Sequence, residues 1–187
     1  MQFFTPQLYQ RFNSPDPAEE ERAYEAWEQA VLAYKQQLDS VRDRMPSQLI
    51  ALSELCLHDA EVIRREETTQ ASGPIFFPHE FPFPVPFSMW SAVAVITLRL
   101  DGEILCLFYS LWDHIRTREA PDNWQFSKLR EHWLYDEVQV HGERRFTTYI
   151  HSILLSTGVV LDIPFMSVVV HRFPIPQTAA LPEKRTD

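Results

Sequence analysis

The sequence predicts an α+β fold, an antiparallel sheet of about five or six strands with N-terminal helices packed on one face. In the first third of the chain, helix start signals precede apolar residues at helical spacing. The remainder is a series of short apolar runs separated by turn residues. With 187 residues and 45% hydrophobic content, the chain fits one domain, which we place at residues 1–173, followed by a polar, flexible tail at 174–187.

Two helix starts share one pattern, a capping residue followed by proline, at Thr5-Pro6 and Asp16-Pro17. They predict a short helix at 5–12 and a long helix from residue 17, which Pro46 ends before a further helix at 46–55. The long helix carries one apolar stripe, made of Tyr24, Trp27, Val31, Tyr34, Leu38, Val41 and Met45. We expect this stripe to cover the protein's own sheet. The alternative is a homodimer seam through Trp27, Tyr34 and Leu38.

The strands are expected at 60–69, 91–100, 103–112, 133–140, 146–156, 159–165 and 168–172. Asp101-Gly102 is typical of a two-residue type I′ hairpin turn. This turn fixes the expected register, in which Leu98 faces Leu105, Ile96 faces Leu107 and Ala94 faces Tyr109.

A segment at 73–90 interleaves prolines with large apolar side chains, which excludes a helix. So apolar a segment does not lie free in water without exposing a large patch. We expect it to pack over the sheet. The alternative is a contact with a partner protein through Phe81, Phe83 and Phe87.

The charge balance disfavours several partners, since 26 acidic and 17 basic residues give a net charge of −9 that repels nucleic acid and anionic membranes. The chain shows no signal peptide and no apolar stretch of membrane-spanning length. Cys56 and Cys106 have apolar neighbours, as buried reduced thiols do, so we expect a cytoplasmic protein. All four glycines coincide with turns, and no phosphate loop or zinc motif occurs, so no cofactor is predicted.

The junction Leu57-His58-Asp59-Ala60-Glu61-Val62 lies between the helices and the strands. Its His58, Asp59 and Glu61 have the chemistry to bind a metal, move a proton or hold a helix against the sheet. In an extended strand, His58 faces away from both carboxylates. We therefore favour the structural role, with hydrogen bonds to the end of the 46–55 helix.

His151 is a second candidate, expected opposite Asp162 on the last hairpin. The favoured interpretation is that His151 is a half-buried strand residue near Asp162 or Tyr149. The alternative is a catalytic role for His151 together with His58, Asp59 and Glu61. If a metal takes part, its expected ligands are Asp59, Glu61 and His151.

Several motifs together resemble an uncharacterised bacterial family, a domain of unknown function: FFTPQLYQRFNS, LHDAEV, LYDEV and HSILLSTGVVLDIPF. The resemblance covers both ends of the chain and implies no activity, cofactor or site residue. The expected function is that of a non-enzymatic protein-interaction module, of the immunity or adaptor kind. The alternative is a metal-dependent hydrolase with its site near His58, Asp59 and Glu61.

Overall fold

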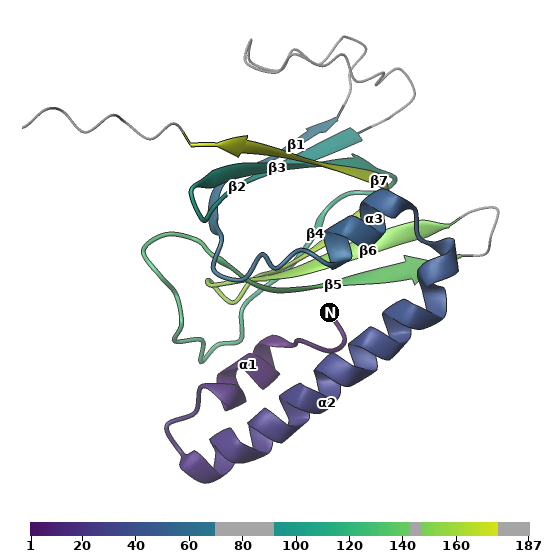
Figure 1. Cartoon of the computed structure of the whole chain (residues 1–187). Helices are drawn as coiled ribbons and strands as arrows, with labels where there is room; N and C mark the ends of the chain where they lie inside the picture. Colours follow the sequence, from purple (N-terminus) through teal and green to yellow (C-terminus); the bar gives the residue numbers. More distant parts are fainter. Residues whose placement is uncertain (70–91, 143–146, 176–187) are drawn as a thin grey trace, which may run out of the picture.

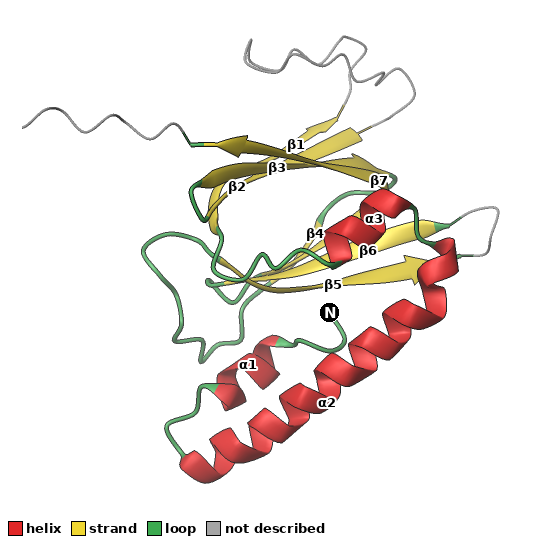
Figure 2. Ribbon diagram, in the orientation of Figure 1, coloured by secondary structure: helices red, strands yellow, loops and turns green. Residues whose placement is uncertain are grey.

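The computed structural model of the chain describes residues 1–69, 92–142 and 147–175. Three helices precede a curled antiparallel sheet, so the predicted α+β class is confirmed (Figures 1 and 2). The strands run in the order β1-β2-β3-β7-β6-β5, and a short strand β4 also pairs with β7. Their bounds are β1 Glu61–Thr69, β2 Ala92–Leu100, β3 Glu103–Leu111, β4 Arg116–Arg118, β5 Trp133–His141, β6 Thr148–Leu155 and β7 Val160–Pro174.

The helices begin where the capping signals place them. Helix α1 spans Pro6–Phe12 and α2 spans Pro17–Val41, and the Thr5 and Asp16 side chains accept hydrogen bonds from the first-turn amides of Leu8 and Ala18. A 3₁₀ turn η1, Arg42–Arg44, and helix α3, Ser47–Ser53, follow on either side of Pro46.

The apolar stripe of α2 divides between two environments. The Trp27 ring lies 4.3 Å from the Tyr135 ring of β5, and the Tyr34 hydroxyl accepts a hydrogen bond from the Val138 amide at 2.7 Å. Leu38 packs against the core. Tyr24 and Val31 are 53% and 43% exposed, so only part of the stripe covers the protein's own sheet.

The β2–β3 hairpin has the predicted register, with Leu98 opposite Leu105, Ile96 opposite Leu107 and Ala94 opposite Tyr109. Its turn residues Asp101 and Gly102 have φ of 49° and 80°. Positive φ at both central residues is what a type I′ turn requires.

Strand β7 divides the sheet into two halves. Its residues 165–174 pair with β3, whereas residues 160–165 pair with β6 on one side, and residues 160–162 pair with β4 on the other. We call β1, β2, β3 and the second part of β7 the β2 half, and β4, β5, β6 and the first part of β7 the β6 half. The halves lie over each other with α3 in the opening between them (Figure 1).

The core lies between these two halves. Leu49 and Leu52 of α3 are fully buried and belong to the same cluster as Leu98 of the β2 half and Trp133 of the β6 half. Helices α1 and α2 pack outside the β6 half (Figure 2). The curl is fixed by backbone hydrogen bonds that join the edge strands at one end, from Val62 to Glu131 and from Trp133 to Ala60.

Three details differ from the sequence prediction. The strands expected at 159–165 and 168–172 form one strand, because the chain passes through an irregularity opposite Ser110 and Leu111 without leaving the ladder. Strand β4 lies between the strands expected at 103–112 and 133–140, where no strand was predicted. Cys56 is exposed, whereas Cys106 is buried as expected.

In the part of the chain that the structure describes, no helix has the length and apolar character needed to cross a membrane.

Candidate functional site

A hollow of about 220 Å³ lies between the two halves of the sheet. It lies where the halves separate beyond Leu111: this residue faces Ala92, the first residue of β2, and the chain resumes pairing with β7 only at Arg116. The lining comes from β1, β2, β7 and the chain around β4, and consists of Arg65, Glu66, Glu67, Ala94, Val95, Ile96, Ile115, Thr117 and Leu161.

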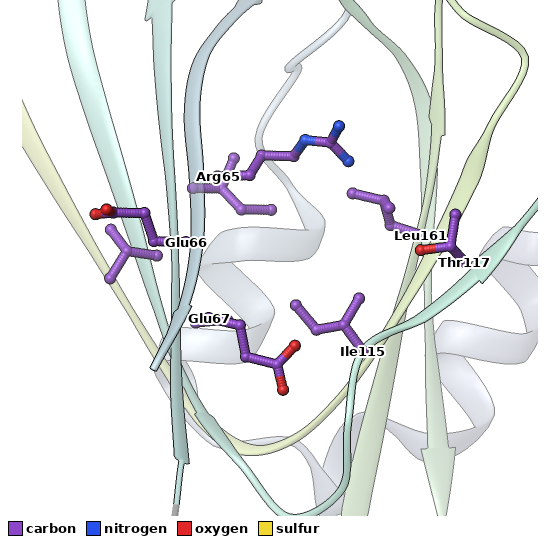
Figure 3. A pocket seen from close by; sticks show the side chains of 9 residues that line it. Arg65, Glu66, Glu67, Ile115, Thr117 and Leu161 are labelled. Atoms are coloured by element: carbon purple, nitrogen blue, oxygen red, sulfur yellow. The ribbon is translucent and has the colours of Figure 1, made fainter. Parts of the chain in front are cut away.

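The wall formed by β1 is charged. Arg65 and Glu67 both point into the hollow, while Glu66 between them points away, as alternation along a strand requires (Figure 3). Ile115 and Leu161 lie across from them, and the Thr117 side chain lies beside Leu161 (Figure 3). The hollow therefore combines an apolar wall with one cationic and one anionic group, a composition suited to an amphipathic ligand.

Both charged groups have protein partners that orient them. The Arg65 Nε atom lies 3.1 Å from Glu131 Oε2, and the Arg65 Nη2 atom donates to Glu131 Oε1 at 3.3 Å. The Glu67 Oε1 atom lies 3.5 Å from Nδ1 of His114. The Arg65 and Glu67 side chains remain 40% and 29% exposed, so solvent and ligands reach them.

The junction forms a surface cluster, and its geometry corrects the extended-strand prediction. His58 Nδ1 lies 3.0 Å from Asp59 Oδ2, on the same side of the chain. The reason is that Asp59 has a φ of 64°, in the left-handed region, which turns the chain instead of extending it. The Asp59 amide donates to the Trp133 carbonyl at 2.8 Å.

The two junction carboxylates hold the 119–132 loop, not the end of α3. Asp59 Oδ1 lies 3.0 Å from Lys128 Nζ, and the hydrogen bond from Lys128 is the largest cause that lowers the pKa of Asp59. Glu61 accepts from Arg130 at 2.9 Å and from Arg99 at 3.0 Å. Each carboxylate therefore already has a cationic partner.

His151 lies in the core, between the two halves of the sheet. Its expected neighbour Asp162 is on the other face of β7, because His151 pairs with Ile163 while Ser152 pairs with Asp162. Instead, His151 Nε2 lies 2.9 Å from Asp136 Oδ2 of β5, and its Nδ1 lies 2.9 Å from the Tyr109 hydroxyl of β3.

This buried chain of hydrogen bonds is complete at both ends. Burial raises the pKa of Tyr109 well above its ordinary value, so the hydroxyl keeps a proton that it can donate to Nδ1 of a neutral His151. His151 then donates from Nε2 to Asp136, whose Oδ1 accepts from the Trp133 indole at 2.8 Å. We call Tyr109, His151, Asp136 and Trp133 the interior brace, since it links the two halves of the sheet.

Glu137, a strand carboxylate to which the sequence assigned no role, is fully buried. It accepts hydrogen bonds from the backbone amides of Gln2 and Phe3, the latter at 2.8 Å, and from the side-chain amide of Gln139 at 3.0 Å. Its backbone partners, Gln2 and Phe3, are far away in the chain, and no local pattern marks them.

The structure does not gather the proposed metal ligands. His58 and Asp59 meet at the surface, Glu61 pairs with two arginines, and His151 lies in the core. Within residues 1–69, 92–142 and 147–175, no three His, Cys, Asp or Glu side chains form a group that could hold an ion. Phe81, Phe83 and Phe87 lie outside the described residues.

Comparison with protein-family models and with curated protein sequences finds no match. The resemblance to an uncharacterised bacterial family stays a prediction.

Proposed function

We propose that this chain is a non-enzymatic binding protein whose binding site is the hollow between the two halves of its sheet. The observation that supports this proposal is the lining, in which Arg65 and Glu67 face the apolar wall formed by Ile115 and Leu161 (Figure 3). Concave sites with apolar walls and a few converging polar groups are where proteins bind small ligands.

The roles of the histidine and carboxylate candidates support binding over catalysis. His151 has both ring nitrogens engaged inside the core, and Asp59 and Glu61 hold the 119–132 loop through Lys128 and Arg130. A general base or a metal ligand must instead present a lone pair to a substrate or an ion. Among the residues that the structure describes, no contact favours the metal-dependent hydrolase over this structural role.

The proposal is tested by measuring whether small molecules bind in the hollow. The full chain is titrated with a mixed pool of small metabolites, and its melting temperature and backbone NMR spectrum are recorded. Thr117→Trp places a large side chain at the hollow and is expected to abolish the shifts. Thr68→Trp is the matched control, since residue 68 is on the face of β1 away from Arg65 and Glu67. Equal responses from both variants, or no response from the wild type, would overturn the proposal.

If the chain instead interacts with another protein chain, a different surface is available, on helix α2. Helix α2 exposes Tyr24, Val31 and Leu32 at 53%, 43% and 60%, while Trp27, Tyr34 and Leu38 contact the same protomer. We propose that a homodimer, if formed, uses the exposed set. Light scattering at high concentration tests this, because Leu32→Glu should convert a dimer to a monomer. A wild type that is monomeric throughout would exclude it.

A further inference from the structure

The hollow presents two opposite charges from the same face of one strand, and this pair selects a class of ligand. Arg65 and Glu67 are two residues apart on β1, so their Cα atoms are about 7 Å apart and their side chains project on the same face. Figure 3 shows the guanidinium of Arg65 and the carboxylate of Glu67 separated by open space. A ligand that meets both groups must carry an anionic and a cationic group close together.

The apolar wall adds a third requirement. Ile96 lies opposite Arg65 and Ala94 opposite Glu67 in the β1–β2 ladder, while Ile115 and Leu161 close the far side. Because these side chains offer no hydrogen bonds, the part of the ligand between them must be apolar and uncharged. The ligand therefore needs an aliphatic group branching from its two charges.

The size of the hollow favours small ligands. Its 220 Å³ is below the ~300–1,000 Å³ typical of drug-sized ligands and corresponds to roughly seven liquid water molecules. A nucleotide, a sugar with several rings or a long acyl chain would extend out of the hollow into solvent. A small amphipathic zwitterion fits.

The partners of Arg65 and Glu67 leave room for such a ligand. Glu131 engages the Nε and Nη2 atoms of Arg65, and none of the described residues is shown bonded to its Nη1 atom. Glu131 thereby fixes the plane of the guanidinium, and its Nη1 edge remains able to donate to a carboxylate. Among the described residues, the one ionic partner of Glu67 is the exposed His114 imidazole, at 3.5 Å.

We propose that the hollow binds a free α-amino acid with an aliphatic side chain, such as leucine or valine. The α-carboxylate accepts hydrogen bonds from Arg65, the α-ammonium donates to Glu67, and the side chain packs among Ile96, Ile115 and Leu161. This assignment rests on the proposed binding function and names its ligand. Because both charges belong to one molecule, an acid or an amine alone forms only half of the contacts.

The experiment is calorimetric titration of the full chain with L-leucine and L-valine. Isocaproate keeps the carboxylate and the aliphatic group of leucine, isoamylamine keeps the ammonium and the aliphatic group, and glycine keeps both charges alone. We expect each of the three to bind at least about tenfold more weakly than leucine, because each lacks one of the three contacts.

Matched variants on one strand locate the binding site. Arg65→Gln and Glu67→Gln should each weaken leucine binding at least about tenfold. Arg64→Gln, on the face of β1 away from Arg65 and Glu67 and outside the lining of the hollow, should leave it unchanged within about twofold. Circular dichroism and the melting temperature of each variant confirm that it is folded.

The outcomes distinguish failure of the amino-acid assignment from failure of the proposed binding function. If no amino acid binds, or if isocaproate or isoamylamine binds as well as leucine, the amino-acid assignment is wrong. The proposed function survives that result when the metabolite pool still shifts the wild type but not Thr117→Trp. If leucine binds but Arg64→Gln weakens it as much as Arg65→Gln and Glu67→Gln do, the ligand is not in the hollow, and both proposals fail.

Discussion

Two histidine–aspartate pairs in this molecule have nearly the same separation and very different surroundings. His58 and Asp59 are 3.0 Å apart and 41% and 55% exposed, whereas His151 and Asp136 are 2.9 Å apart and 0% and 17% exposed. At the surface, water solvates either partner when the contact is lost. In the core, losing one partner leaves the others desolvated without hydrogen bonds. Burial, more than distance, therefore sets the importance of each pair.

The largest effect is expected from the buried pair. His151→Leu removes the acceptor of Tyr109 and a donor to Asp136 while keeping apolar volume, and should lower the free energy of unfolding by about 3 kcal/mol. Urea denaturation measures the change. The double variant with Tyr109→Phe should cost less than the sum of the single changes, because the hydroxyl is then no longer left unpaired. Strict additivity would contradict a connected brace.

A second buried carboxylate extends the comparison. Glu137→Gln replaces one acceptor oxygen by an amino group that faces backbone donors, and should cost about 1–3 kcal/mol. Amide hydrogen exchange should rise at Gln2, Phe3 and Phe4, whose amides lose this acceptor. Unchanged exchange at these residues would show that Glu137 does not hold the segment.

At the surface pair, the backbone should matter more than the carboxylate. Asp59→Ala keeps a side chain with a Cβ in the left-handed region and loses the ion pairs, and should cost about 1–2 kcal/mol. Asp59→Gly loses the same ion pairs but accepts the positive φ, and should stay within about 0.5 kcal/mol of the wild type. Equal losses in thermal denaturation would assign the effect to the charge instead.

The smallest effect is the pH dependence from the surface pair. The Lys128 hydrogen bond lowers the pKa of Asp59 in the folded protein. A lowered folded-state pKa gives stability that is present above the unfolded pKa of about 3.9 and is lost as the pH falls through the folded pKa.

Asp59→Asn measures this contribution, because asparagine tolerates the left-handed backbone and carries no charge. Since Asp59 is 55% exposed, we expect at most about 0.5 kcal/mol difference from the wild type at pH 7. The difference should shrink when urea denaturation is repeated below about pH 4. A difference that grows on acidification would show that the carboxylate destabilises the folded state.

Local sequence signals predicted the parts of the fold that neighbouring residues control. The caps at Thr5 and Asp16 and the Asp101-Gly102 turn each act within a few residues, and all occur as predicted. The same holds for the β2–β3 register, because the turn fixes which residues face each other. The hollow had no such signal, since its lining comes from residues 65–67, 94–96, 115–117 and 161.

The site residues show the same division. The sequence singled out His58, Asp59 and His151 as chemically able, but it assigned His151 to Asp162 because the two share a hairpin. A shift of one residue in register moves a side chain to the other face of a strand, and here it places His151 beside Asp136. The sequence could not show the left-handed turn at Asp59, since no glycine marks this position.

The sequence by itself determined the class of the fold, the helix starts and the hairpin register, because alternation, capping and turn preferences are short-range properties of the backbone. Only the tertiary structure decided which charges face the hollow, which histidine is buried and which carboxylates hold the loop. These depend on how the two halves of the sheet fold over each other. That arrangement is set by packing between residues far apart in the chain, which no local pattern records.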